Sequence, residues 1–126
     1  MNEQQVNRTE ARGLEIPKYG LSRLGMKAAK LIVKVMKEHE LYDTGGCRAF
    51  YTPQDWKDRS ESYGHGAELI VVHDGGAAAH WFNWAYESYK FVEIMHKELA
   101  KIEVHPEQCT GWYTAIYSDK NTESRI

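Results

Sequence analysis

The chain has few cysteines, few prolines and no long apolar run. Its two cysteines, Cys47 and Cys109, are far apart and neither belongs to a Cys-x-x-Cys pair, so the ligand spacing of a structural zinc site is missing. No stretch approaches the roughly 20 apolar residues of a membrane-spanning helix, and the N-terminal residues lack the apolar segment of a secretory signal. We therefore expect a cytoplasmic protein with reduced thiols and no membrane partner.

Neither sign of charge dominates. The 126 residues include 16 Lys and Arg and 18 Asp and Glu, a net charge of −2, which gives no overall argument for binding nucleic acid or a membrane. Aromatic residues are abundant at 12%, and eight of them are tyrosines. Because aromatic side chains dominate both cores and interfaces, this surplus predicts a dense core or a surface that contacts a partner.

The length predicts one domain. Residues 1–17 and 118–126 are polar and lack periodicity, so we expect a flexible N-terminal arm and a flexible C-terminal tail. Residues 18–117 contain no repeat or linker and are predicted to form a single α+β domain.

The first periodic segment, residues 21–41, predicts a helix with one apolar and one basic face. Leu24, Ala28, Ile32 and Val35 fall at helical spacing on the apolar face. Five cations follow one another at steps of three and four on another face: Arg23, Lys27, Lys30, Lys34 and Lys37. That face is either a solvated surface or a basic ridge that docks an anionic partner.

The middle of the chain predicts two strands with a short helix between them. Residues 47–51 form the first strand. Thr52 can cap a helix over residues 53–59, and Asp55 suits its positive end. Residues 67–73 follow as a strand, and their β-branched run is typical of burial on both faces.

The C-terminal part predicts one long helix over residues 77–102. Its apolar stripe includes Trp81 and Trp84, and a second aromatic row includes Phe82, Tyr86 and Tyr89. This apolar arc is wider than one small sheet can cover, so we expect a homo-oligomer.

A turn at residues 106–107 and a strand over residues 111–117 complete the predicted order, α-β-α-β-α-β. The predicted fold class is therefore α+β, with a three-stranded sheet covered by two long helices.

The segment His73-Asp74-Gly75-Gly76 is the best candidate for a site. A buried strand would deliver His73 and Asp74 to the edge of the sheet, and the glycines would leave room for a ligand. The next helix would point its free N–H groups at that space, which favours an anion. The alternative is a purely structural turn, because the segment has neither a P-loop lysine nor a Gly-x-Gly-x-x-Gly motif.

Other side chains could converge on this turn and bind a nucleotide-like ligand. They would supply cations for phosphates, aromatic rings for a base and an amide for its edge. The candidate ligand-binding residues outside the turn are Lys57, Arg59, Tyr63, His65, Phe82, Asn83 and Trp112.

His73, Asp74 and His80 could form a metal site with two histidines and one carboxylate. However, no His-Glu-x-x-His motif supports it, and His80 lies one turn into the predicted helix. We therefore predict no metal and no cofactor, and we assign no catalytic residue.

Four motifs together resemble small, mostly uncharacterised proteins of bacteriophages, prophages and other mobile elements. The resemblance covers about residues 47–117. Such proteins often carry an acidic residue after the glycine pair, where this chain has Ala77, which weakens any role that needs a second carboxylate there. The motifs are Phe50-Tyr51-Thr52-Pro53-x-Asp55-Trp56, Ser62-Tyr63-Gly64, Leu69-Ile70-Val71-Val72-His73-Asp74-Gly75-Gly76 and Cys109-Thr110-x-Trp112-Tyr113-Thr114-Ala115-Ile116-Tyr117.

The resemblance implies action in the cytoplasm of a host cell. Small aromatic-rich oligomers in that setting are often counter-defence proteins, and some sequester a nucleotide second messenger. Our first hypothesis is therefore a non-enzymatic protein that sequesters a small anionic, nucleotide-like ligand. The alternatives are a protein that binds and inhibits a host effector through Tyr86 or the basic ridge, and a hydrolase that depends on His73 and Asp74.

Overall fold

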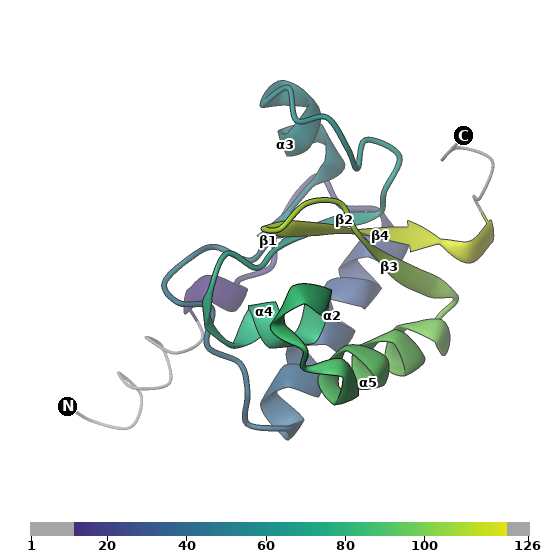
Figure 1. The fold of residues 1–126 in the computed structure, drawn as a ribbon. Coiled ribbons are helices and arrows are strands. Elements are labelled where there is room, and N and C mark those ends of the chain that lie inside the picture. The colour runs from purple at the N-terminus through teal and green to yellow at the C-terminus, as the bar shows by residue number, and fades with distance from the viewer. Residues whose placement is uncertain (1–11, 121–126) are drawn as a thin grey trace.

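A four-stranded antiparallel sheet organises the computed structural model, which describes residues 12–120 (Figure 1). The strand order is β1-β2-β4-β3, and all three pairings are antiparallel. The α+β class is confirmed, but the predicted three strands are wrong because the sheet has four. The strands are β1 Phe50–Tyr51, β2 Leu69–Val72, β3 Val104–Gln108 and β4 Tyr113–Ser118.

Helices cover the two faces of the sheet unequally. In Figure 1, α2, α4 and α5 lie below the sheet, whereas α3 lies alone above it. The larger part of the core joins the lower face to those three helices, and a smaller cluster around Trp56 joins the upper face to α3. The helices are η1 Arg12–Leu14, α2 Arg23–Glu38, α3 Pro53–Asp58, α4 Gly76–Phe82, η2 Trp84–Tyr86 and α5 Tyr89–Ala100.

The described part of the predicted N-terminal arm packs on this domain. Leu14 is buried in the main core, and the carbonyl of Gly13 accepts a hydrogen bond from the N–H of Ala49 at 2.8 Å. Residues 1–11 and 121–126, which make up most of the predicted arm and tail, lie outside the described residues.

The predicted amphipathic character of α2 is confirmed. Ser22 caps the helix by accepting a hydrogen bond from the N–H of Gly25 at 2.9 Å. Ala28, Ile32 and Val35 are buried, Leu24 is half-buried, and the five predicted cations are all exposed. The predicted start of α3 is also confirmed, because Thr52 and Asp55 form a reciprocal capping box.

The predicted long helix over residues 77–102 is wrong. The chain leaves α4 at Asn83, whose backbone is extended, forms the short helix η2, and turns at Glu87 in the left-handed region (φ 57°) before α5 begins. The Asn83 side chain caps η2 by accepting the N–H of Ala85 at 2.9 Å. Short polar side chains compete with helical hydrogen bonds in this way, and here that competition ends the helix.

The predicted turn at residues 106–107 is also wrong, because Pro106 lies in the middle of β3. Just beyond the two ends of β3, the backbone N–H of Cys109 donates to the carbonyl of Tyr113, and that of Asp119 donates to the carbonyl of Glu103. The odd-numbered residues of β3 therefore occupy the hydrogen-bonded pairs with β4. Hydrogen-bonded and non-bonded pairs alternate in an antiparallel ladder. The backbone nitrogen of Pro106 therefore faces the free edge of the sheet, so its lack of an N–H costs no hydrogen bond to β4.

Strand β2 is buried at all four residues, which confirms the prediction of burial on both faces. Leu69 and Val71 contact the main core, and Ile70 and Val72 contact the cluster around Trp56. Within residues 12–120, no helix combines the length and apolar character needed to cross a bilayer.

Candidate functional site

The predicted site turn begins with a histidine that points into the protein. His73 is 1% exposed, and its ring lies roughly parallel to that of Phe82 at a centroid distance of 6.1 Å. Its ring atom Nε2 is hydrogen-bonded to the hydroxyl of Thr114 at 2.9 Å. The backbone N–H of His73 donates to the backbone carbonyl of Trp112 at 2.9 Å. His73 therefore joins β2 to β4 and does not line a ligand space.

Burial also keeps His73 uncharged at neutral pH. Removal from solvent lowers the pKa of the imidazole from its usual value of 6.5 to about 4, because a buried environment penalises the charged ring. Hydrogen bonds to backbone groups and the charge of Asp74 oppose this effect but are smaller. A general base needs access to a substrate, and His73 has none in this arrangement.

One of the two glycines, Gly76, leaves room for another part of the chain. Gly75 and Gly76 both have positive φ, at 106° and 66°. A Cβ atom on Gly76 would lie 2.5 Å from the backbone nitrogen of Gly45 and 2.8 Å from the carbonyl oxygen of Asp43. The space beside Gly76 is therefore occupied by the loop at residues 43–46, whereas a Cβ on Gly75 would meet nothing within 4 Å.

The expected free N–H groups at the start of α4 are also in use. The carbonyl oxygen of Asp43 accepts from Ala77 at 2.5 Å and from Ala78 at 3.2 Å. Beside this point lies an open hollow of about 570 Å³ whose lining includes Glu40 and Asp43. With the N–H groups of Ala77 and Ala78 taken, the start of α4 loses the free donors on which the expected anion site depended. Any ligand role for Asp74, Gly75 and Gly76 stays a prediction.

The alternative metal set is not assembled. Among the described residues, no three His, Cys, Asp or Glu side chains come together as metal ligands. Instead, His80 is hydrogen-bonded through Nδ1 to the hydroxyl of Ser88 at 2.7 Å, and its ring contacts that of Tyr86 at 5.3 Å. Cys47 and Cys109 are both free thiols, and burial raises the pKa of the Cys109 thiol.

Phe82 and Asn83, two of the predicted ligand residues, are buried at 3% and 4% exposure. The Asn83 amide donates to the carbonyl of Gly111 at 3.0 Å, and its oxygen accepts from the Gln108 amide at 3.0 Å. Asn83 therefore connects the end of α4 to the β3–β4 hairpin, and neither side chain faces solvent.

Arg59 and Trp112, however, are brought together on the upper face of the sheet. The guanidinium carbon of Arg59 lies 4.7 Å from the centre of the Trp56 ring and 6.0 Å from that of Trp112. It also lies 5.7 Å from the ring centre of Tyr51, and Arg48 lies 4.1 Å from the same ring. We call Arg48, Tyr51, Trp56, Arg59 and Trp112 the arginine–aromatic cluster.

Both arginines of this cluster are half-exposed and have carboxylate partners. Arg48 lies 3.8 Å from Asp55, and Arg59 lies 3.4 Å from Glu61. Sequence reasoning missed Arg48 and Tyr51, because their part in the cluster depends on the pairing of β1 with β2 and on the position of α3. The only local signal is that Arg48 comes three residues before Tyr51, the last residue of β1.

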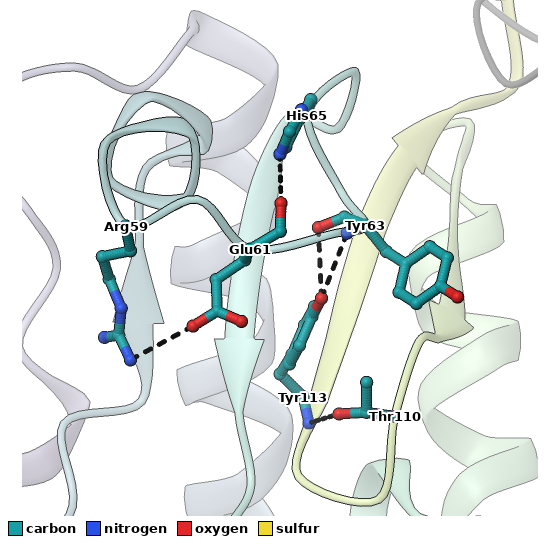
Figure 2. Close-up of polar contacts among 6 residues, drawn as sticks. All are labelled: Arg59, Glu61, Tyr63, His65, Thr110 and Tyr113. Atoms are coloured by element: carbon teal, nitrogen blue, oxygen red, sulfur yellow. Dashed lines mark hydrogen bonds and ion pairs between the residues drawn. The ribbon is translucent and has the colours of Figure 1, made fainter.

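Figure 2 shows how the loop after α3 is attached to β4. The hydroxyl of Tyr113 donates to the carbonyl of Tyr63 and accepts from its N–H, each at 3.3 Å. His65 is hydrogen-bonded to the carbonyl of Glu61 at 2.5 Å. The Tyr63 ring is 58% exposed and points away from Arg59 in the figure, so the structure does not gather Tyr63 and His65 into the arginine–aromatic cluster. Lys57 is exposed on α3.

The strongest surface anomaly is a group of exposed aromatic side chains at the break between α4 and α5. Trp84, Tyr86 and Tyr89 are 43%, 47% and 51% exposed, and we call them the aromatic patch. The ring of Trp84 lies 6.0 Å from that of Tyr89 and 5.6 Å from that of His96. Tyr86 and Tyr89 belong to the predicted second aromatic row, whereas Trp84 was predicted to lie in the core.

No protein-family model, curated protein or solved structure matches this chain. The resemblance to mobile-element proteins therefore stays a prediction, and the function must be argued from the geometry.

Proposed function

We propose that this is a non-catalytic binding protein that engages a partner protein through the aromatic patch. The observation that carries the proposal is the exposure of three large aromatic side chains within six residues. Soluble proteins seldom leave such groups together in solvent unless they form an interaction site. Trp and Tyr are also the residues most enriched among those that dominate binding energy at interfaces.

The patch is held in place before any partner arrives. The N–H of Trp84 donates to the side chain of Gln108 at 3.0 Å, and Gln108 in turn donates to Asn83 at 3.0 Å. Asn83 is anchored to the hairpin through Gly111. Side chains on a fixed base lose less conformational entropy on binding, which favours affinity.

The environment of His73 supports binding without chemistry. The hydrolase hypothesis needs His73 and Asp74 to act together on a substrate. His73 is buried against Thr114 and Phe82 with a lowered pKa, so it is poorly placed to exchange protons with a bound molecule. In the setting that the resemblance implies, the partner would be a host effector.

Affinity capture with matched variants tests the proposal. Tagged wild-type protein and the Trp84→Ala, Tyr86→Ala and Tyr19→Ala variants are incubated with a bacterial lysate, and a recovered protein is purified and titrated against each. Tyr19 is the control, because it is 87% exposed and lies outside the patch. We expect each patch variant to weaken binding about 30-fold, the effect of losing about 2 kcal/mol at a central contact. Equal binding by wild type and both patch variants would contradict the proposal.

The arginine–aromatic cluster favours a second candidate function, sequestration of a small anionic nucleotide-like ligand. It joins two predicted ligand residues, Arg59 and Trp112, to a second arginine and to Tyr51. Guanidinium groups bind phosphates and aromatic rings stack on bases. We therefore centre this hypothesis on the upper face of the sheet, where Trp112 borders the turn by accepting the backbone N–H of His73.

Thermal-shift and calorimetric screening against cyclic nucleotides and ADP-ribose derivatives tests this candidate. A ligand at about 100 times its Kd stabilises the protein by about 2.7 kcal/mol, which raises Tm by about 10 °C in a domain of this size. Arg59→Gln should abolish the shift, whereas Lys120→Gln, outside the cluster, should keep it. No shift with any of these ligands, or a shift that survives Arg59→Gln, would count against the cluster.

A further inference from the structure

Helix α2 exposes a continuous row of positive charge that neither proposed function uses. Its 16 residues contain five cations and a single acidic residue, Glu38. All five cations are exposed, and they represent almost a third of the 16 Lys and Arg in a chain whose net charge is −2. We call them the basic stripe: Arg23, Lys27, Lys30, Lys34 and Lys37.

The stripe is straight and long. Successive members are four, three, four and three residues apart, which keeps them on one side of a helix with 3.6 residues per turn. The rise of about 1.5 Å per residue places Arg23 about 21 Å from Lys37 along the axis. The opposite side of α2 is buried against the sheet and α5, so the stripe points away from the protein.

Carboxylates of the protein neutralise little of this charge. Among residues 12–120, the only ion pair of the stripe joins Lys34 to Glu38 at 3.9 Å, and both side chains are more than half exposed. Such exposed pairs contribute little binding energy. Glu98 of α5 also interacts with Lys34, but it is closely paired with Lys101. Glu68 lies at the N-terminal end, where it accepts a hydrogen bond from Ser22.

We infer that the basic stripe binds the phosphate backbone of duplex DNA without sequence specificity. Each strand of a duplex places a phosphate about every 3.4 Å along the axis, so a length of about 21 Å carries about six phosphates on each strand. The strands wind around the axis, so the straight stripe faces the phosphates on its own side of the duplex. Four of the five cations are lysines, which bind phosphate as point charges. Contacts of lysine and arginine with phosphate oxygens fix the position of the protein on the duplex and carry no sequence information.

A membrane surface fits these observations less well. Amphipathic helices that lie on a bilayer insert an apolar face between the lipids. In α2 that face, which includes Ala28, Ile32 and Val35, is buried in the core. An acidic protein is the other possible polyanion, and it is an outcome of the following test.

Fluorescence anisotropy with a labelled duplex of about 20 base pairs tests the inference, in salt from about 50 to 200 mM. With all five cations in contact with phosphates, the plot of log affinity against log salt should have a slope of about −4.5. The triple variant Lys27→Gln, Lys30→Gln and Lys34→Gln should reduce the slope to about −2 and weaken binding at low salt at least tenfold. The matched control replaces three exposed lysines outside α2, Lys18, Lys90 and Lys120, by Gln and should keep the wild-type slope.

Circular dichroism and thermal melting establish that both triple variants fold. The inference is overturned if the wild-type protein does not bind the duplex at low salt, if the stripe variant keeps its slope, or if both triple variants lose binding equally. Stripe-dependent binding of polyglutamate without binding of DNA would also overturn it and would assign the stripe to an acidic protein.

Discussion

A single histidine links the stability of the sheet to pH. His73 is buried between β2 and β4, and burial lowers its pKa from 6.5 to about 4. In the unfolded chain the ring takes up a proton near pH 6.5, whereas in the folded protein it is protonated only near pH 4. The unfolded state therefore binds more protons between these values, and stability falls as the pH falls through this window.

We expect the free energy of unfolding to decrease by about 3 kcal/mol from this residue between pH 7 and pH 4, since each pKa unit corresponds to about 1.4 kcal/mol. Urea unfolding across this range measures the total change, and His73→Gln should flatten the dependence. Nuclear magnetic resonance of the native protein gives the pKa of His73 directly, even if the variant does not fold. An ordinary value near 6.5 would refute the prediction.

Asn83 determines where the predicted long helix is divided. Its side chain makes three hydrogen bonds, to Gly111, Ala85 and Gln108, and it is 4% exposed. The helical periodicity of residues 77–102 is real over both halves, since Trp81 and Met95 are both buried. Periodicity alone did not reveal that the Asn83 side chain forms hydrogen bonds with the β3–β4 hairpin and that the helix ends there.

We expect Asn83→Ala to destabilise the protein by about 2–4 kcal/mol, because three part-buried hydrogen bonds are lost. Gln54→Ala is the control. It removes an exposed hydrogen bond to Asp58 and should change stability by less than about 0.5 kcal/mol. Urea unfolding at equal m-values measures both variants, and a loss for Asn83→Ala no greater than that of the control would contradict this role.

Local patterns predicted the elements whose signals are contained in a few adjacent residues. The capping box of Thr52 and Asp55, the apolar face of α2 and the buried strand β2 are of this kind. The strand β3 was missed because Pro106 is compatible with a sheet only at a free edge, and strand order determines where that edge lies.

The candidate site was predictable in part. The sequence identified Arg59 and Trp112 as ligand candidates, and the fold places them about 6 Å apart. It could not show that the Asp43 carbonyl takes the N–H groups of α4, because that contact spans more than 30 residues of sequence. The same limit hid the exposure of Trp84, which follows from the break at Asn83.

At the scale of the whole molecule, self-association stays a prediction with a revised basis. The original argument was the wide apolar arc of one long helix, and that helix is divided. The aromatic patch now provides the exposed apolar surface, so self-association through it would compete with the binding of a partner protein. Sedimentation velocity at micromolar concentration should give a dimer or larger species that dissociates with Trp84→Ala. A wild-type monomer under these conditions would refute self-association.

The position of Pro106 limits what such an assembly can become. Proteins that add strands to an exposed sheet edge can grow without end into fibres. Here the β3 edge lacks a donor at its middle residue, and β1 at the other edge has only two residues. A strand added beside β3 would lack one hydrogen bond at Pro106, and a strand added beside β1 could pair with only two residues. Copies of this chain that assemble would therefore do so through side chains and not by extending the sheet.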